Sequence, residues 1–284
     1  MADPLFRSLF DDASLFPPAG LGMLDAVAGH LRHGTAWYRE MCGPFVVAAA
    51  RLPQLGAVLT AAGVAELDLA LVLPGGAADL DAALDAVFAD PRLRLRAVEL
   101  PVDPGGADVA GAVGAVAAAL DRAPLAGATA FIEVPAAYVT TAAARAAAEH
   151  GYLMKLRTGG TEAATFPSEV TLADAIRTLA GERVGFKCTA GLHHAVRHQA
   201  ADTGFEHHGF LNVLLAVAAA RAGADGGDVA VRLAETNASA VAAQVSQLDE
   251  DAAAGARELF TSFGTCSTDE PVADLVTLGL VTAG

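Results

Sequence analysis

Short apolar segments alternate with alanine-rich segments along most of the chain. The apolar segments are rich in Val, Leu, Ile and Phe, which is typical of strands buried on both faces. The predicted strands cover residues 7–13, 45–51, 66–73, 93–100, 128–134, 152–158, 184–190 and 258–264. The predicted helices between them include 79–90, 107–123, 140–151 and 172–182. The chain therefore reads as a regular succession of strands and helices.

This alternation predicts a parallel sheet covered by helices. Eight strand–helix units in roughly 250 residues is the size of a (β/α)8 barrel of the TIM type. No linker or compositional break divides the sequence, so we expect a single barrel domain over residues 1–284. An open doubly wound sheet is the alternative. No G-x-G-x-x-G follows the first strand, which disfavours the dinucleotide-binding version of that sheet.

The last quarter of the chain leaves the position of strand eight open. Segment 209–256 is longer than one connecting helix requires. We expect two helices there, one over 209–223 and one within 228–244. The stretch VAVRL (229–233) also fits a strand, and it is the alternative to 258–264 for strand eight.

The composition limits the classes of partner. The formal net charge is −15, which disfavours nucleic acid and anionic membranes as partners. No uncharged apolar segment approaches the roughly 18 residues of a membrane span, and the N-terminus lacks a signal-peptide pattern. Three separated cysteines form neither a disulfide framework nor a zinc ribbon. We expect a cytoplasmic protein with a small-molecule substrate, and a homo-oligomer stays open.

Lysine is unusually scarce in this sequence. Of the 18 basic residues only Lys155 and Lys187 are lysines, so sixteen are arginines. A guanidinium group stays protonated and is a poor nucleophile, whereas an amine can lose its proton. The two lysines are therefore candidates for chemistry that arginine cannot perform.

Both lysines fall at matching places on adjacent predicted strands. Residues two apart share a face of a strand, which groups Lys155 with Arg157 and Lys187 with Thr189. Barrel enzymes carry their chemistry at the C-terminal ends of strands. One role for the lysines is attack on a substrate carbonyl to form a Schiff base. The other is binding of a phosphate or carboxylate, together with the amides of the glycines that follow in KLRTGG and KCTAG.

The stretches LMKLRTGG and VGFKCTAG resemble the strand six and strand seven motifs of the deoxyribose-phosphate aldolase family, which are class I aldolases. The resemblance implies that Lys155 forms the Schiff base and that Lys187 is a second lysine that perturbs it. It also implies a strand-four carboxylate in the site. Arg157 stands where the family has a small residue, and CTAGLHH replaces the family's Gly-Gly turn.

Acidic residues near the ends of neighbouring strands are candidate acids and bases. Glu133 lies near the end of strand five and Glu99 near the end of strand four. Each fits either a place in the site or an ordinary charge at the edge of a loop, and Glu133 also fits an ion pair with Arg157. Asp11 and Asp12 close the first strand, where we expect a helix or turn cap.

Five histidines follow strand seven, namely His193, His194, His198, His207 and His208. Imidazole is the commonest protein ligand of metals, but HHAVRH does not have a ligand spacing such as H-E-x-x-H. We therefore expect no metal or other cofactor here. We favour substrate binding or proton transfer by His193 and His194, with solvated loop histidines as the alternative.

The leading hypothesis is an aldolase-like or lyase-like enzyme that acts on a small phosphorylated or carboxylated carbonyl compound through a lysine Schiff base. The alternatives are a metal-dependent hydrolase or isomerase that uses the histidines, and a non-catalytic binding barrel. The predicted catalytic residues are Lys155, Lys187, Glu133 and His193. The predicted substrate-binding residues are Glu99, Arg157, Thr158, Thr189, Gly191, His194 and, in the SFGTCS loop after strand eight, Ser262, Gly264 and Thr265.

Overall fold

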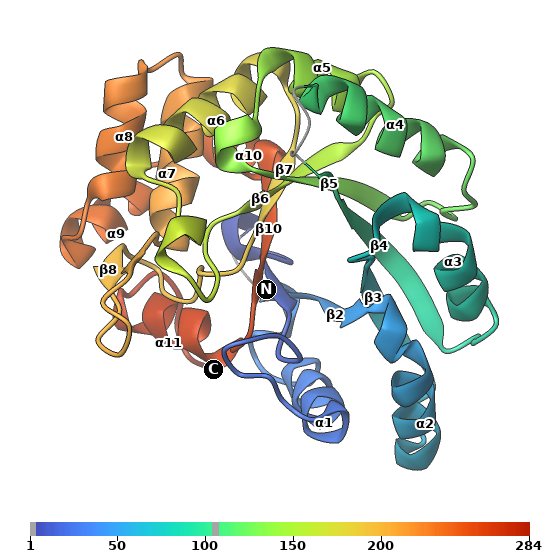
Figure 1. The fold of residues 1–284 in the computed structure, drawn as a ribbon. Coiled ribbons are helices and arrows are strands. Elements are labelled where there is room, and N and C mark those ends of the chain that lie inside the picture. The colour runs from blue at the N-terminus through green and yellow to red at the C-terminus, as the bar shows by residue number, and fades with distance from the viewer. Residues whose placement is uncertain (1–3, 104–107) are drawn as a thin grey trace.

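A computed structural model describes residues 4–103 and 108–284, and it contains a closed barrel of eight parallel strands (Figure 1). The strand order around the barrel is β1-β10-β7-β6-β5-β4-β3-β2. The (β/α)8 prediction is confirmed, and the open-sheet alternative is wrong because β10 pairs with β1 and closes the sheet. The strands are β1 (Phe10–Asp12), β2 (Cys42–Ala48), β3 (Leu67–Val72), β4 (Leu93–Pro101), β5 (Thr129–Pro135), β6 (Leu153–Arg157), β7 (Phe186–Thr189) and β10 (Phe260–Thr265).

Helices surround the barrel on its outside (Figure 1). They are α1 (Met23–His33), α2 (Leu52–Ala62), α3 (Leu80–Phe88), α4 (Val109–Asp121), α5 (Thr141–Ala148), α6 (Glu169–Glu182), α7 (Phe210–Arg221), α8 (Gly226–Ala234), α9 (Ala238–Ser246), α10 (Glu250–Leu259) and α11 (Asp269–Thr277). Short 3-10 turns lie at η1 (Pro4–Phe6), η2 (Arg39–Met41), η3 (Ala49–Arg51), η4 (Gly76–Asp79), η5 (Ala136–Tyr138) and η6 (Ala163–Thr165). Helices α3 to α6 match the four helices predicted from the sequence, except that residue 107 lies outside the described residues.

Side-chain caps begin several of these helices. The hydroxyls of Thr140 and Ser168 accept a hydrogen bond from the backbone N–H three residues on, at the start of α5 and α6. The carboxylate of Asp108 does the same for α4. Such caps satisfy backbone donors that have no partner within the helix. They explain why the alanine-rich segments begin as helices at these residues.

Of the two helices predicted for segment 209–256, the first is confirmed as α7, but the second is wrong, because α8, α9 and the start of α10 follow in its place. Asp225, Asn237 and Asp249 each cap the start of a separate helix. The alternative strand VAVRL is also wrong, since it lies within α8. Val229 and Leu233, four residues apart, form the buried face of that helix. Strand eight is β10, as the 258–264 assignment predicted.

The barrel interior divides into an apolar part and a charged part. Val46, Ala70, Ala97 and Phe131 form a small interior cluster, separate from the large core between the barrel and the helices. Barrel interiors are usually filled by layers of branched apolar side chains. Here ionised groups take that place toward the C-terminal ends of the strands.

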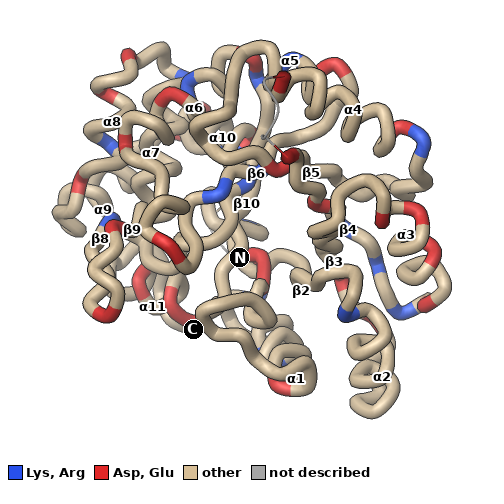
Figure 2. Tube along the Cα trace, in the orientation of Figure 1, with Lys and Arg blue, Asp and Glu red and all other residues tan. Residues whose placement is uncertain are grey.

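A two-stranded antiparallel sheet, β8 (His198–Gln199) and β9 (Glu206–His207), projects from the segment between β7 and α7. No helix among the described residues combines the length and the apolar character that crossing a membrane would require. Acidic and basic positions are both spread over the helices and loops around the barrel, and charged positions of both signs also lie near β5 and β6 at its centre (Figure 2).

Candidate active site

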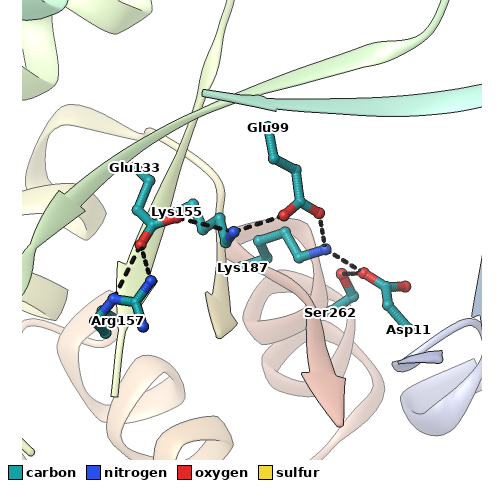
Figure 3. Close-up of polar contacts among 7 residues, drawn as sticks. All are labelled: Asp11, Glu99, Glu133, Lys155, Arg157, Lys187 and Ser262. Atoms are coloured by element: carbon teal, nitrogen blue, oxygen red, sulfur yellow. Dashed lines mark hydrogen bonds and ion pairs between the residues drawn. The ribbon is translucent and has the colours of Figure 1, made fainter. Parts of the chain in front are cut away.

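Six charged side chains form a continuous chain of ion pairs through the barrel interior (Figure 3). Their signs alternate, and the three carboxylates match the three cations in number. In order, the members are Asp11, Lys187, Glu99, Lys155, Glu133 and Arg157. We call this group the ion chain. It connects β1, β7, β4, β6 and β5, and its formal charge sums to zero.

Glu99 holds the two lysines together. Lys155 and Lys187 are register partners on β6 and β7, so the matched positions predicted from the sequence are confirmed. Lys155 Nζ lies 2.6 Å from Glu99 Oε2, and Lys187 Nζ lies 2.6 Å from Glu99 Oε1. Both ammonium groups thus point into the barrel and share one carboxylate.

Asp11 closes the inner end of the ion chain. Its Oδ2 accepts from Lys187 Nζ and, at 2.8 Å, from the hydroxyl of Ser262. The expectation that Asp11 caps a turn is wrong, because its side chain points into the barrel. Asp12 does accept from the backbone N–H of Ser14 at 3.1 Å, as in a turn, and its other oxygen lies 3.1 Å from His30 Nδ1.

Burial and pairing set the protonation of the inner groups. Burial alone would lower the pKa of Lys187, but Asp11 and Glu99 outweigh it and raise that pKa above its usual value. Burial opposes ionisation of Glu99, yet the two ammonium groups lower its pKa to about 2. Burial raises the pKa of Asp11, and Lys187 offsets that effect only in part. Lys187 therefore stays an ammonium ion at neutral pH.

Exposure increases along the ion chain toward Arg157. The side chain of Lys187 is 1% exposed and that of Lys155 is 4% exposed. Glu133 is 12% exposed and Arg157 is 45% exposed. Burial would raise the pKa of Glu133, but Lys155 and Arg157 outweigh it and lower that pKa. The solvent-exposed end of the ion chain is therefore at Arg157, and the two amines lie farther inside.

Glu133 bridges Lys155 and Arg157. Its Oε2 lies 2.9 Å from Lys155 Nζ. Its Oε1 accepts from both Nε and Nη2 of Arg157, at 3.1 and 2.8 Å. The ion pair with Arg157 weighed in the sequence analysis is present, together with the contact to Lys155. Nη1 of Arg157 has no partner within residues 4–103 and 108–284.

The Thr and Gly residues after the two lysines join the ends of β6 and β7. The hydroxyl of Thr158 donates to the carbonyl of Ala190 at 2.6 Å. Gly191 has a φ of +77°, and a Cβ there would stand 2.8 Å from the Thr158 carbonyl oxygen. Thr189 pairs with Arg157 in register and is half-buried. Thr158 and Gly191 thus fix the strand ends beneath the site.

Two polar residues of the SFGTCS loop are buried and already hydrogen bonded. Ser262 binds Asp11, and the hydroxyl of Thr265 donates to the Ser267 carbonyl at 2.9 Å. Gly264 lies beside the interior, where a Cβ would stand 3.8 Å from Thr189 Oγ1. A Cβ on Gly264 would therefore make only ordinary van der Waals contacts.

The histidines after β7 contact α11 and neighbouring loops. His193 Nδ1 lies 3.2 Å from Glu270 Oε2, and His194 Nδ1 lies 3.1 Å from Asp274 Oδ2. His198 and His207 stack on each other, and His208 Nε2 lies 2.8 Å from the Pro167 carbonyl oxygen. Burial lowers the pKa of His193, His198 and His208. In the described part of the chain, no three His, Cys, Asp or Glu side chains are grouped so that they could hold a metal ion.

The sequence analysis missed Asp11 as a member of the site. The available signal was its position at the C-terminal end of a barrel strand, where chemistry gathers. That signal did not distinguish Asp11 from Asp12, because both residues lie at the end of strand one.

Comparison with protein-family models finds no match to this chain, and no curated protein matches it.

Proposed function

We propose that this chain is an enzyme that binds a small carbonyl compound as a Schiff base on Lys155 and makes or breaks a carbon–carbon bond. The observation that carries the proposal is the sharing of Glu99 by two buried amines in the interior of a (β/α)8 barrel. Lysine amines form Schiff bases with carbonyl substrates, and a second nearby cation favours loss of a proton from the reacting amine. Dehydration and cyclisation are variants of the same chemistry.

Lys155 is the better nucleophile of the two lysines. Lys187 is the more buried of the two, and Asp11 and Glu99 hold it as an ammonium ion. Lys155 contacts Glu133, which reaches toward the exposed side of the site. In this assignment Lys187 supplies fixed positive charge, and Lys155 attacks the carbonyl carbon.

Glu133 is placed to move the proton that the reaction requires. It accepts a proton from the Lys155 ammonium, which frees the amine to attack the carbonyl carbon. It then returns that proton to the former carbonyl oxygen, carries a second proton from the attacking nitrogen to the same oxygen, and the oxygen leaves as water. The ammonium and the carbonyl compound become a protonated imine and water, so charge and atoms balance without any added reagent. Glu99 then faces the positive imine.

The ion chain is a poor device for stability alone. Taking charges out of water is costly, and apolar side chains of similar volume are often as stable as a buried ion pair or more so. A barrel that needed only a core would fill this layer with branched apolar residues. A reactive site gives a reason for keeping six ionised groups there.

The resemblance to the deoxyribose-phosphate aldolase family supports the same proposal. It implies two lysines on strands six and seven and a strand-four carboxylate. Lys155, Lys187 and Glu99 stand on β6, β7 and β4, with Glu99 in contact with both amines. Arg157 has no equivalent in that pattern, so the substrate need not be the family's.

The two alternatives have less support. A metal-dependent hydrolase needs an assembled ligand set, whereas His193 and His194 each contact a different carboxylate of α11. A non-catalytic binding barrel would have no need of a buried lysine pair, and arginine would serve as an anion anchor.

Trapping with borohydride tests the proposal. Purified protein is incubated with acetaldehyde, pyruvate or glyceraldehyde 3-phosphate, reduced, digested and mapped by mass spectrometry. We expect a reduced adduct on Lys155 with at least one probe, and the chain has only one other lysine to compare. Lys155→Arg should abolish it, whereas Lys187→Arg should slow trapping and keep the adduct on Lys155. Absence of an adduct with every probe, or an adduct on Lys187 alone, would contradict the proposal.

A further inference from the structure

We infer that the substrate is a 2-oxo acid, a compound whose carboxylate is bonded directly to the carbonyl carbon that Lys155 attacks. The inference deepens the proposed function and rests on it. The geometry that carries it is the bridge from Lys155 through Glu133 to Arg157. In this inference Arg157 binds the substrate carboxylate, and that carboxylate is bonded to the carbon that Lys155 attacks.

Arg157 is close to Lys155 along a single strand. The two residues are two positions apart on β6, so their side chains share a face and their Cα atoms are about 6.6 Å apart. Both cations contact the same carboxylate, with Glu133 Oε2 on Lys155 and Oε1 on Arg157. The gap between amine and guanidinium is therefore the size that one carboxylate spans.

A 2-oxo acid fits that gap by its covalent dimensions. The two oxygens of a carboxylate are about 2.2 Å apart, given C–O bonds near 1.23 Å. In a 2-oxo acid the carbonyl carbon and the nearest carboxylate oxygen are about 2.4 Å apart. Such a substrate can place its carboxylate on Arg157 and its carbonyl carbon at Lys155. A phosphate separated from the carbonyl by several carbons is too distant to bind Arg157 in this way.

Arg157 is the cation available to an incoming anion. It is the most exposed member of the ion chain, and in the described part of the chain its Nη1 has no partner. The planar guanidinium binds carboxylates through two parallel hydrogen bonds. At present Nε and Nη2 both donate to a single oxygen of Glu133, so this paired geometry is not used. A substrate carboxylate can therefore take the guanidinium and release Glu133.

The charge balance favours a singly charged substrate. The ion chain has no net formal charge, and a proton that moves from Lys155 to Glu133 and back leaves that sum unchanged. A substrate carboxylate adds one negative charge beside Arg157, whereas a phosphate dianion adds two. The second negative charge would be costly in a water-poor site of an already acidic molecule.

Other anchors predicted for a phosphate are engaged elsewhere. The hydroxyls of Thr158, Ser262 and Thr265 each have a partner within the protein. All three residues are buried, whereas Arg157 is nearly half exposed. The side chains near the amines thus offer one anion site, next to the reacting carbon.

The test compares the borohydride trapping rate of pyruvate with that of acetaldehyde, which lacks the carboxylate. We expect pyruvate to be trapped faster than acetaldehyde and than glyceraldehyde 3-phosphate at equal low concentration. Arg157→Gln should lower the pyruvate-to-acetaldehyde ratio about tenfold or more, because a hydrogen-bonded charge pair is lost. Arg157→Lys keeps the charge without the planar fork, so its ratio should fall between those of wild type and Arg157→Gln. Circular dichroism of each variant checks that the fold is kept.

Each outcome has a separate meaning. A ratio that stays the same in Arg157→Gln, or preference for the phosphorylated probe, would overturn the 2-oxo acid while the adduct on Lys155 still supports the proposed function. Loss of trapping with every probe in the wild-type protein would overturn the proposed function itself, and the 2-oxo acid with it.

Discussion

Lys155 and Lys187 stand at the same register on β6 and β7, and each donates to a different oxygen of Glu99. One carboxylate thus holds two ammonium groups in the interior of the barrel. Like charges repel strongly where water is excluded, so the two lysines depend on the anion between them. Glu99 is therefore the member of the ion chain whose loss leaves two buried ammonium groups short of a carboxylate.

Removing the charge of Glu99 should destabilise the protein strongly. Glu99→Gln keeps the shape of the side chain but leaves two buried ammonium groups short of a carboxylate. We expect the free energy of unfolding to fall by about 3–5 kcal/mol, measured by urea denaturation at neutral pH. The matched control is Glu258→Gln, since Glu258 is 74% exposed and lies 3.4 Å from Arg221. That variant should differ from wild type by less than about 1 kcal/mol, and an equally small effect at Glu99 would contradict the prediction.

The contribution of Glu99 to the free energy of unfolding should disappear in acid. Its pKa in the folded protein is about 2, below the ordinary value of 4.5. A lowered carboxyl pKa gives stability that is present above the unfolded value and is lost as the pH falls through the folded value. We therefore expect the stability difference between wild type and Glu99→Gln to be full at neutral pH and to shrink between pH 4.5 and pH 2.

Urea midpoints measured across this pH range provide the check. Burial raises the pKa of Asp11, which gives it the opposite sign of pH dependence. Both proteins keep Asp11, so its direct contribution largely cancels in the comparison. A difference that stays constant down to pH 2 would show that Glu99 acts by its shape rather than by its charge.

Much of the fold and half of the site follow from local patterns in the sequence. Strands and helices alternate with periods that are visible within ten residues, and the scarcity of lysine marks Lys155 and Lys187. Their matched positions follow because adjacent parallel strands carry the same alternation of faces. The proximity of Glu133 to Lys155 follows from the same rule, since the two are register partners on β5 and β6.

The rest of the site depends on closure of the barrel. Asp11 meets Lys187 across 176 residues of sequence, and the pairing of β10 with both β1 and β7 brings them together. Glu99 reaches both amines across the barrel interior, from a strand that pairs with neither β6 nor β7. His193 likewise finds its partner Glu270 only because α11 returns beside the loop after β7. A single sequence without aligned relatives carries no signal for contacts of this range.

The glycine at position 159, after Lys155, has a packing role that the sequence did not indicate. The sequence suggested amides that bind an anion, and in the structure Gly159 also lies against Gly191 and Phe166, where the segments after β6 and β7 meet. A Cβ on Gly159 would stand 2.8 Å from Gly191 Cα. We expect Gly159→Ala to lower the free energy of unfolding by roughly 1–3 kcal/mol, because backbone must move. Denaturation with urea gives the measurement.

The control for this glycine is Gly114→Ala in the middle of α4. A Cβ there meets nothing within 4 Å among the described residues, and alanine favours a helix over glycine. That variant should gain up to about 1 kcal/mol of stability. Equal effects of the two substitutions would show that the close approach of residue 159 to Gly191 does not require a glycine.

Glu133 provides the sharpest test of how the site works. It lies between Lys155 and Arg157, with an oxygen 2.9 Å from the amine. Glu133→Gln can still hydrogen bond but cannot accept a proton from the ammonium. If Glu133 moves that proton, borohydride trapping should slow by roughly 10²- to 10⁴-fold, with the adduct still on Lys155. Stopped reactions analysed by mass spectrometry give the rate and the modified peptide.

A second variant separates proton transfer from simple charge pairing. Glu133→Ala leaves a space beside Lys155 that a small carboxylate such as formate or acetate can enter. Added formate should restore part of the trapping rate, and the effect should saturate with concentration and fail with chloride. The opposite result would be faster trapping in Glu133→Gln than in wild type. That outcome would mean that Glu133 only holds the ammonium in its charged form, and another group would have to take the proton before Lys155 can attack.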